Sequence, residues 1–304
     1  MRYPQRSTTA MPAVLLLVAL LAACQGGTAA PRSESSAASA SASALTDPSA
    51  SPSQRVVSGK VDVGGHSLYY ACFGEGSPTV ILEHGLGGDL GQWGAVIPAI
   101  SPRTTVCGYD RANVRGSNTV DGLRTAADSV ADLHALLRRA PIAGPYVLVG
   151  FSWGGLVDQL YARTYPDEVK GLVLVDSNSA DEDRTYWAHL TPAQVAADKQ
   201  EIAGPNPEHV DIVRSFDLVH AAPAMPDIPL VVVSHTVADP NAWPPGWDPA
   251  TFEKLGAQLQ AGLVHLTSKG SQVFAEGAGH DIPEEAPDVV SKAILRVLDA
   301  VGRS

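Results

Sequence analysis

The residues best suited to chemistry form a five-residue turn with a serine at its centre. Gly150-Phe-Ser-Trp-Gly154 stands between an apolar run at 146–149 and a run of helical spacing at 156–165. In this G-x-S-x-G pattern between a strand and a helix, a sharp turn lifts the serine hydroxyl above the sheet. We therefore predict that Ser152 is a nucleophile. The backbone N–H of Trp153, at the start of the helix, can stabilise the oxyanion of an attacked carbonyl.

A serine hydroxyl is a weak nucleophile unless a base takes its proton, and the chain has nine histidines. His280 follows the last predicted strand, at 271–274, and precedes the closing helix, at 286–298. From there its imidazole can reach over the edge of the sheet to Ser152, so we predict that it is the general base. Weaker candidates, in a hairpin turn, in helical runs or in a polar insertion, are His66, His134, His189, His209, His220 and His265.

The third member of such a site is an acid that orients the histidine and stabilises the imidazolium. Two aspartates stand after strands: Asp176 after the strand at 171–175, and Asp239 after the strand at 230–233. Each also has a structural alternative, Asp176 as a helix cap or loop brace and Asp239 in an Asp-Pro turn. The residues alone leave both aspartates open as the acid.

A glycine-rich turn supplies a second group of backbone donors. His84-Gly-Leu-Gly-Gly88 follows the predicted strand at 78–83. The glycines let backbone N–H groups point into the site, so we expect the N–H of Leu86 to face that of Trp153 as the second donor of an oxyanion hole. We expect His84 to hold the turn and to take no part in the reaction.

Strand-like and helix-like runs alternate along the folded part of the chain. Further strands are predicted at 56–63, 67–73 and 104–109, and further helices at 90–100, 125–139 and 252–266. Gly64-Gly65 joins the first two strands, which is typical of a hairpin. The alternation predicts an α/β fold whose mostly parallel sheet opens with an antiparallel hairpin and has helices on both faces. Residues 177–226 break the alternation and are predicted to form a small helical lid.

The first 53 residues carry signals for export. Residues 1–23 combine basic residues with an apolar run of signal-peptide length, and Leu21-Ala-Ala-Cys24 resembles the bacterial lipoprotein box. We expect a lipid anchor on Cys24 and an extracytoplasmic protein held on the cell membrane; the alternative is an ordinary secretory peptide and release. Residues 24–53 are rich in Ser and Ala and are predicted to be a disordered tether. Residues 54–304 are then one folded domain.

Charge and composition exclude several classes of protein. The net charge is −11, from 32 acidic and 21 basic residues, so we expect no binding to nucleic acid. Three cysteines are too few for a disulfide framework, and a hydrophobic content of 45% excludes wholesale disorder. No metal-ligand spacing is present, and we expect no cofactor. We expect a monomer whose partner is a small acyl substrate.

The His-Gly turn, the serine turn and the late Gly-His pair together resemble the α/β-hydrolase superfamily over essentially all of residues 55–302. The resemblance implies an eight-stranded sheet. Tyr109-Asp-Arg111 is similar to a group of bacterial esterase-like members, but those continue with Ala-Gly-x-Gly where this chain has Ala112-Asn-Val-Arg-Gly-Ser117. Asn113 can adopt the left-handed backbone of a glycine. Arg115 is either an exposed loop charge or a cation at the rim of the pocket.

The resemblance bears on the acid and on two cysteines. In relatives with Tyr-Asp-Arg and a Leu-Val-Leu-Val-Asp strand end, the acid comes from the sixth strand, which favours Asp176 over Asp239. The superfamily's strand order places the second and fourth strands side by side. Cys72 and Cys107 lie on those strands, and an exported protein meets an oxidising compartment. We predict a disulfide between them; two buried free thiols are the alternative.

The resemblance also implies a function: a serine hydrolase that cleaves an acyl bond, most simply a carboxylic ester, through an acyl-enzyme without metal or cofactor. A serine nucleophile argues against dehalogenase and epoxide-hydrolase chemistry, which the superfamily carries out with aspartate. Aminopeptidase, carbon–carbon hydrolase and haloperoxidase-like activities share the same residues. A non-catalytic binding module on the cell surface is the alternative from another class. Four tryptophans either line an acyl pocket or pack within the insertion: Trp153, Trp187, Trp243 and Trp247.

Overall fold

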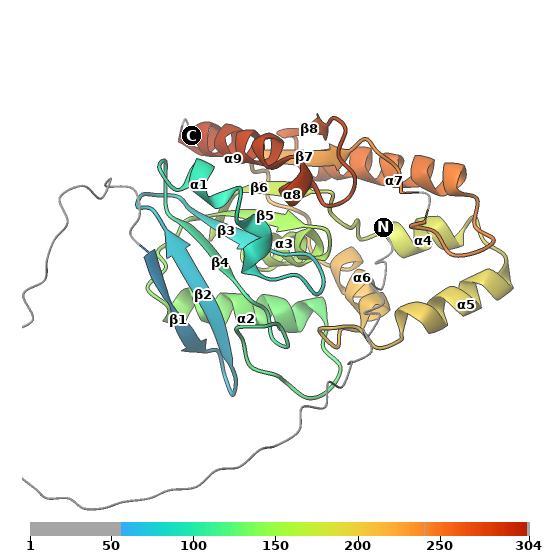
Figure 1. Cartoon of the computed structure of the whole chain (residues 1–304), viewed down its shortest axis with the longest axis horizontal. Coiled ribbons are helices and arrows are strands. Elements are labelled where there is room, and N and C mark those ends of the chain that lie inside the picture. The colour runs from blue at the N-terminus through green and yellow to red at the C-terminus, as the bar shows by residue number, and fades with distance from the viewer. Residues whose placement is uncertain (1–55, 240, 303–304) are drawn as a thin grey trace, which may run out of the picture. The chain divides into compact units, whose positions relative to one another are not determined.

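The chain folds around an eight-stranded sheet (Figure 1). The structure, a computed structural model, describes residues 56–239 and 241–302. The strands are β1 (Val56–Asp62), β2 (Ser67–Phe73), β3 (Thr79–Glu83), β4 (Val106–Tyr109), β5 (Tyr146–Phe151), β6 (Val169–Val175), β7 (Leu230–His235) and β8 (Gly270–Ala275). They lie in the order β1-β2-β4-β3-β5-β6-β7-β8. β2 is antiparallel to β1 and β4, and the other neighbours are parallel. The predicted α/β class and the opening hairpin are confirmed.

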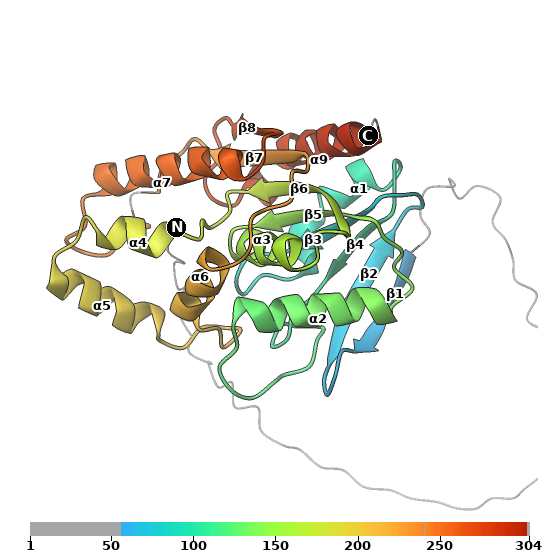
Figure 2. The same ribbon diagram turned by 180° about the vertical axis from the view of Figure 1, so that it is seen from behind.

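The central strands are apolar because helices cover both of their faces. Every residue of β3, β4 and β5 is buried, whereas exposure alternates along the edge strand β1. One face packs against α2 (Ala126–Arg139), α3 (Trp153–Thr164) and α6 (Ile212–His220), and the other against α1 (Ile97–Ile100), α8 (Ile282–Glu285) and α9 (Pro287–Val301). Figure 2 looks onto the face that carries α2 and α3. Two layers of helices and one sheet therefore form the core.

Three helices lie between β6 and β7, in the segment predicted as a lid: α4 (Glu182–Trp187), α5 (Pro192–Ile202) and α6. α6 packs on α2 and α3, and its Phe216 and Val219 belong to the core on that face of the sheet. α4 packs on α7 (Pro249–Leu263), which is followed by a 3₁₀ turn, η2 (Val264–Leu266). Figures 1 and 2 show α4, α5 and α7 together at one side of the sheet. The last helix of the insertion is therefore part of the core.

The run at 90–100 forms two short turns and not the single helix expected from its spacing. η1 (Leu90–Trp93) is a 3₁₀ turn, and α1 begins only at Ile97. Pro98 has no backbone N–H and is tolerated only in the first turn of a helix. The chain therefore starts a new helix at this proline instead of continuing from Trp93, and the expectation of one helix was wrong.

Cys72 and Cys107 form a disulfide between β2 and β4. The two residues are direct partners in the antiparallel register of these strands, which are neighbours in the sheet as the superfamily's strand order implies. The bridge therefore joins the opening hairpin covalently to the rest of the sheet.

The predicted signal peptide, Cys24 and the tether, residues 1–53, lie outside the described residues. In the part of the chain that the structure describes, no helix combines the length and the apolar character that a membrane span requires.

Candidate active site

Ser152 stands between β5 and α3 in a backbone conformation that few residues adopt. Its φ is 53° and its ψ is −120°, a region that a Cβ disfavours. The residues two positions away must be glycines. A Cβ at Gly150 would stand 2.5 Å from the Cα of Gly155, and a Cβ at Gly154 would stand 2.4 Å from the carbonyl oxygen of Glu83. Close contacts with the backbone therefore restrict positions 150 and 154 of the G-x-S-x-G turn to glycine.

The structure brings His280 and Asp176 to Ser152. His280 lies in the loop after β8, and its Nε2 is 3.0 Å from Oγ of Ser152. Its Nδ1 is 2.6 Å from Oδ2 of Asp176, which directly follows β6. The imidazole also packs against Phe151, with ring centroids 4.8 Å apart. Serine, histidine and acid form a continuous chain of hydrogen bonds above the carboxyl ends of three strands, the arrangement of a nucleophile, its base and an orienting acid.

Asp176 is a buried carboxylate with two histidine partners. Its side chain is 2% exposed. Burial alone would raise its pKa, but hydrogen bonds from His235 and His280 outweigh burial and hold the pKa well below the usual range. The carboxylate is therefore ionised and accepts hydrogen bonds on both oxygens. Its φ of 40° is unusual for a residue with a side chain, and such positions cluster at functional sites.

The alternative acid, Asp239, does not reach His280. Asp239 is exposed, and its Oδ1 accepts a hydrogen bond from the backbone N–H of Asn241 at 2.8 Å. This local contact is the turn that an Asp-Pro pair favours. Of the two aspartates, Asp176, the one favoured by the resemblance, is the partner of His280.

Sequence reasoning missed His235, the last residue of β7. Its Nδ1 is 2.8 Å from Oδ1 of Asp176, the oxygen that His280 leaves unused. Its Nε2 is 3.7 Å from Oε2 of Glu253 on α7. Burial opposes the charged ring, but Asp176 and Glu253 together raise the pKa of His235 above its ordinary value. The only signal in the sequence was its position at the end of the strand next to β6.

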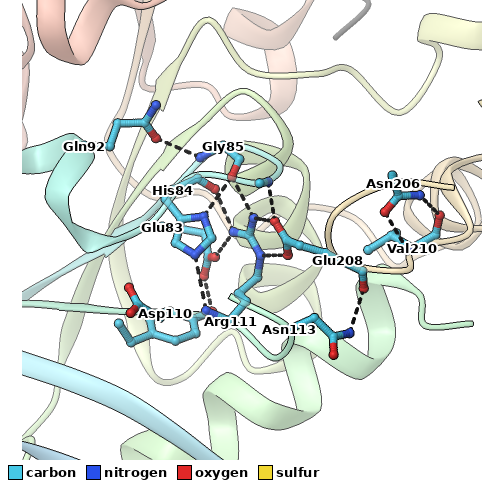
Figure 3. Close-up of polar contacts among 12 residues, drawn as sticks. Glu83, His84, Gly85, Gln92, Asp110, Arg111, Asn113, Asn206, Glu208 and Val210 are labelled. Atoms are coloured by element: carbon cyan, nitrogen blue, oxygen red, sulfur yellow. Dashed lines mark hydrogen bonds and ion pairs between the residues drawn. The ribbon is translucent and has the colours of Figure 1, made fainter. Parts of the chain in front are cut away.

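The glycine-rich turn at 84–88 is held by buried polar groups (Figure 3). The guanidinium of Arg111 donates to the carbonyl oxygens of His84 and Gly85, at 2.6 and 2.9 Å. The N–H of Gly85 donates to Oε1 of Gln92 at 3.0 Å. Burial and the charge of Arg111 lower the pKa of His84 to about 4, so its neutral ring donates to the carbonyl of Gly85 and accepts the N–H of Arg111. His84 braces the turn, as expected.

Two glutamates share Arg111 (Figure 3). Glu208, from the segment before α6, accepts two hydrogen bonds from the guanidinium, at 2.7 and 2.6 Å, and one from the N–H of Gly87 at 2.6 Å. Glu83, the last residue of β3, contacts the guanidinium and the hydroxyl of Tyr109. The three charged side chains are at most 3% exposed. Despite its burial, Glu208 has a lowered pKa because of Arg111, so a charged residue of the insertion fixes the turn.

The two backbone N–H groups expected to bind an oxyanion are those of Leu86 and Trp153. Within residues 56–239 and 241–302, neither group donates a hydrogen bond to the protein. A Cβ built on Gly85 would lie 3.6 Å from the Cβ of Ser152, so the glycine-rich turn adjoins Ser152. Both donors are thus available beside the serine hydroxyl.

The four tryptophans pack against protein groups. Trp153 is fully buried, with the edge of Phe216 on α6 against it. The rings of Trp243 and Trp247 are stacked, with their centroids 6.1 Å apart, in a cluster with Tyr186 and Phe252. The indole N–H of Trp187 donates to Asp198 at 2.7 Å. Of the two alternatives for these rings, the structure shows packing.

Two residues of the loop after β4 depart from the pattern of the relatives. Asn113 has a φ of 70°, so the expectation that it takes the left-handed backbone of a glycine is confirmed. Arg115 has a side chain 78% exposed and forms an ion pair of 3.1 Å with Asp89. Arg115 is therefore the exposed loop charge of the two alternatives.

Comparisons with known proteins agree with this fold. A family described as alpha/beta hydrolase fold matches residues 78–210. The uncharacterized protein YqjL of Bacillus subtilis is 23% identical over 225 residues, 74% of this chain and 85% of that protein. The pimeloyl-[acyl-carrier protein] methyl ester esterase of Yersinia enterocolitica is 27% identical over 141 residues, 45% of this chain and only 50% of the esterase. A thermophilic esterase from Thermogutta terrifontis has a similar fold, with a TM-score of 0.57 at 20% identity over 81% of this chain and 99% of that one.

A mostly parallel eight-stranded sheet with a serine turn after β5 and a histidine after β8 is the architecture of a hydrolase of the α/β kind. Residues 78–210 match the alpha/beta hydrolase family, and the domain around them has the α/β-hydrolase fold, so the protein is a hydrolase of this kind.

Proposed function

We propose that this hydrolase is a serine esterase in which Ser152, His280 and Asp176 form the catalytic triad. The supporting observation is the unbroken chain of hydrogen bonds, 3.0 Å from serine to histidine and 2.6 Å from histidine to aspartate. In the reaction, Oγ of Ser152 attacks the acyl carbon while Nε2 of His280 takes its proton. Asp176 keeps Nδ1 protonated and stabilises the imidazolium.

The N–H groups of Leu86 and Trp153 stabilise the negative oxygen of the tetrahedral intermediate. His280 then gives its proton to the leaving alcohol, and the acyl group remains on Oγ of Ser152. A water molecule that loses a proton to His280 attacks this acyl-enzyme, which releases the acid and restores the serine.

A small carboxylic ester is the proposed substrate. The Yersinia enterocolitica relative is named as an esterase, which supports an ester over an amide. A panel of chromogenic acyl esters and aminoacyl amides of graded size tests this choice. Faster turnover of the amides would show an amidase or aminopeptidase that uses the same triad.

A fluorophosphonate probe tests the nucleophile. We expect the probe to label the native wild type, to fail on S152A and to label S268A, whose serine lies on an exposed loop with Asp227. A native wild type that resists labelling would contradict the proposed enzyme and favour a binding module.

Two matched variants test the acid. D176N leaves His280 without its carboxylate partner, and turnover should fall about 10⁴-fold. D239N changes an exposed turn and should keep wild-type turnover. A large loss in D239N with little loss in D176N would refute the assignment.

A further inference from the structure

The candidate site holds a second histidine on the acid that the proposed triad uses only once. Oδ2 of Asp176 faces His280 at 2.6 Å, and Oδ1 faces His235 at 2.8 Å. The proposed reaction needs the first contact alone. The second is made by a side chain that is only 13% exposed, so it belongs to the interior of the site.

His235 is itself held on its far side. Its Nε2 is 3.7 Å from Oε2 of Glu253, and Oε1 of Glu253 accepts the indole N–H of Trp243 at 2.9 Å. Trp243 is buried in the aromatic cluster beside α4 and α7. Because Asp176 is an ionised acceptor, the ring of His235 presents Nδ1–H to it. The imidazole is therefore fixed between two carboxylates, with a packed aromatic cluster behind it.

We propose that His235 is a positioning residue for the triad: its Nδ1–H fixes Oδ1 of Asp176, so that Oδ2 faces His280. This inference rests on the proposed function. A carboxylate that accepts a hydrogen bond from one partner only can rotate about its Cβ–Cγ bond. A carboxylate whose two oxygens both accept hydrogen bonds keeps one oxygen facing the base. Preorganisation of this kind removes a reorientation that would otherwise precede the reaction.

The charge of His235 has a second consequence. Asp176, after β6, and Glu253, on α7, are the charged groups that face His235, and His280 lies across Asp176 from it. Although burial opposes it, these carboxylates raise the pKa of His235, so the ring is protonated in mildly acidic solution. A positive charge on one side of Asp176 disfavours a second positive charge on the other. The charge of His235 therefore acts, across Asp176, on the positive charge that His280 acquires when it takes a proton in the proposed reaction.

Two variants separate the hydrogen bond from the charge. H235N keeps an N–H donor near the position of Nδ1 but carries no charge, and H235A has neither. In H235A we expect kcat to fall about 100-fold on the pH plateau, with little change in KM. In H235N the plateau kcat is largely restored, and the acidic limb of kcat/KM moves to higher pH by about one unit.

A matched control is H220A. His220 forms the same kind of contact, Nδ1 to Asp181 at 2.6 Å, but both side chains are about half exposed and neither contacts the triad. We expect this variant to keep the wild-type plateau and the wild-type acidic limb. A wild-type plateau in H235A, or equal losses in H235A and H235N with an unmoved acidic limb, would overturn the inference.

A second measurement does not depend on turnover. The NMR titration curve of the His280 ring in substrate-free wild type and H235N should differ, with the curve of H235N at higher pH. If the wild type hydrolyses no ester but the curve moves, the proposed function fails and the coupling of the two histidines stands. If esters are hydrolysed and the curve does not move, the inference alone fails. The same measurement decides the case if H235A does not fold.

Discussion

Ser152 and Asp176 have positive φ angles, 53° and 40°, and each directly follows a strand of the parallel sheet. Such backbone conformations cost on the order of 1–3 kcal/mol each. Hydrogen bonds to the neighbouring strand hold both residues in place: the N–H of Ser152 donates to Val175 at 3.0 Å, and that of Asp176 donates to Val233 at 2.7 Å. These two residues of the proposed triad are therefore fixed by the sheet before any substrate binds, as preorganised catalysis requires.

His84 gives the protein a pH-dependent stability. Its pKa is about 4 in the folded chain against 6.5 as a free side chain, so the unfolded state binds a proton at higher pH than the folded state. The stabilisation is complete above about pH 6.5 and is lost as the pH falls toward 4, by about 3 kcal/mol in total. Urea unfolding of the wild type and H84N at neutral pH and near pH 4 measures it. Between neutral pH and pH 4, the free energy of unfolding should fall by about 3 kcal/mol less in H84N than in the wild type. Equal falls in the two proteins would contradict the prediction.

The residues of the candidate site differ in how well the sequence predicts them. Ser152 has a local pattern of its own, and His280 follows the last strand, so both could be named from short segments. Asp176 and Asp239 both follow strands, and only the path of each loop decides which meets His280. His235 has no motif, because its partner Asp176 lies 59 residues away in the sequence and the contact depends on which strands are neighbours.

Among the elements, the insertion between β6 and β7 reaches the glycine-rich turn through Glu208. E208Q removes the charge from a buried ion pair with Arg111 and weakens the hold on Gly87, so we expect a loss of about 3–5 kcal/mol in stability and a lower turnover. D217N is the matched control. Asp217 forms an ion pair with Arg184 in which the two side chains are 58% and 41% exposed, so we expect its loss to lower the stability by only about 0–1 kcal/mol. Chemical unfolding and ester turnover measure both variants. Equal effects of the two substitutions would show that Glu208 has no special role.

Elements could be predicted where burial dictates the pattern. β5 is buried throughout and was visible as a continuous apolar run. α5, in the insertion, has a single buried residue, the polar Asp198, so no apolar period marked its limits. The run at 90–100 has the right spacing for a helix, but the spacing does not show where Pro98 restarts the chain. That the second and fourth strands are neighbours was implied by the resemblance to a family and not by the residues.

For the molecule as a whole, the Cys72–Cys107 bridge constrains the unfolded chain. It joins residues 35 apart in the sequence, for which loop entropy predicts a stabilisation of about 4 kcal/mol. The C72A/C107A double variant should lose about that amount in urea unfolding, and C24A should lose none. Thiol titration gives a direct check, since denatured C24A should show no free thiol until a reductant is added. Two free thiols without reductant would refute the bridge.

We propose that the attachment of the whole molecule to a membrane depends on a lipid at Cys24. A net charge of −11 disfavours contact with anionic headgroups, and Leu21-Ala-Ala-Cys24 resembles the bacterial lipoprotein box, so the proposed anchor is covalent. Expressed as the full chain in bacteria, the wild type should fractionate with membranes and be released by detergent but not by high salt, because salt screens only charges. C24A should appear in the soluble fraction with an unchanged ester turnover, because the triad does not involve the N-terminal segment. Wild type that is released by salt alone, or that is soluble from the start, would favour an ordinary secretory peptide.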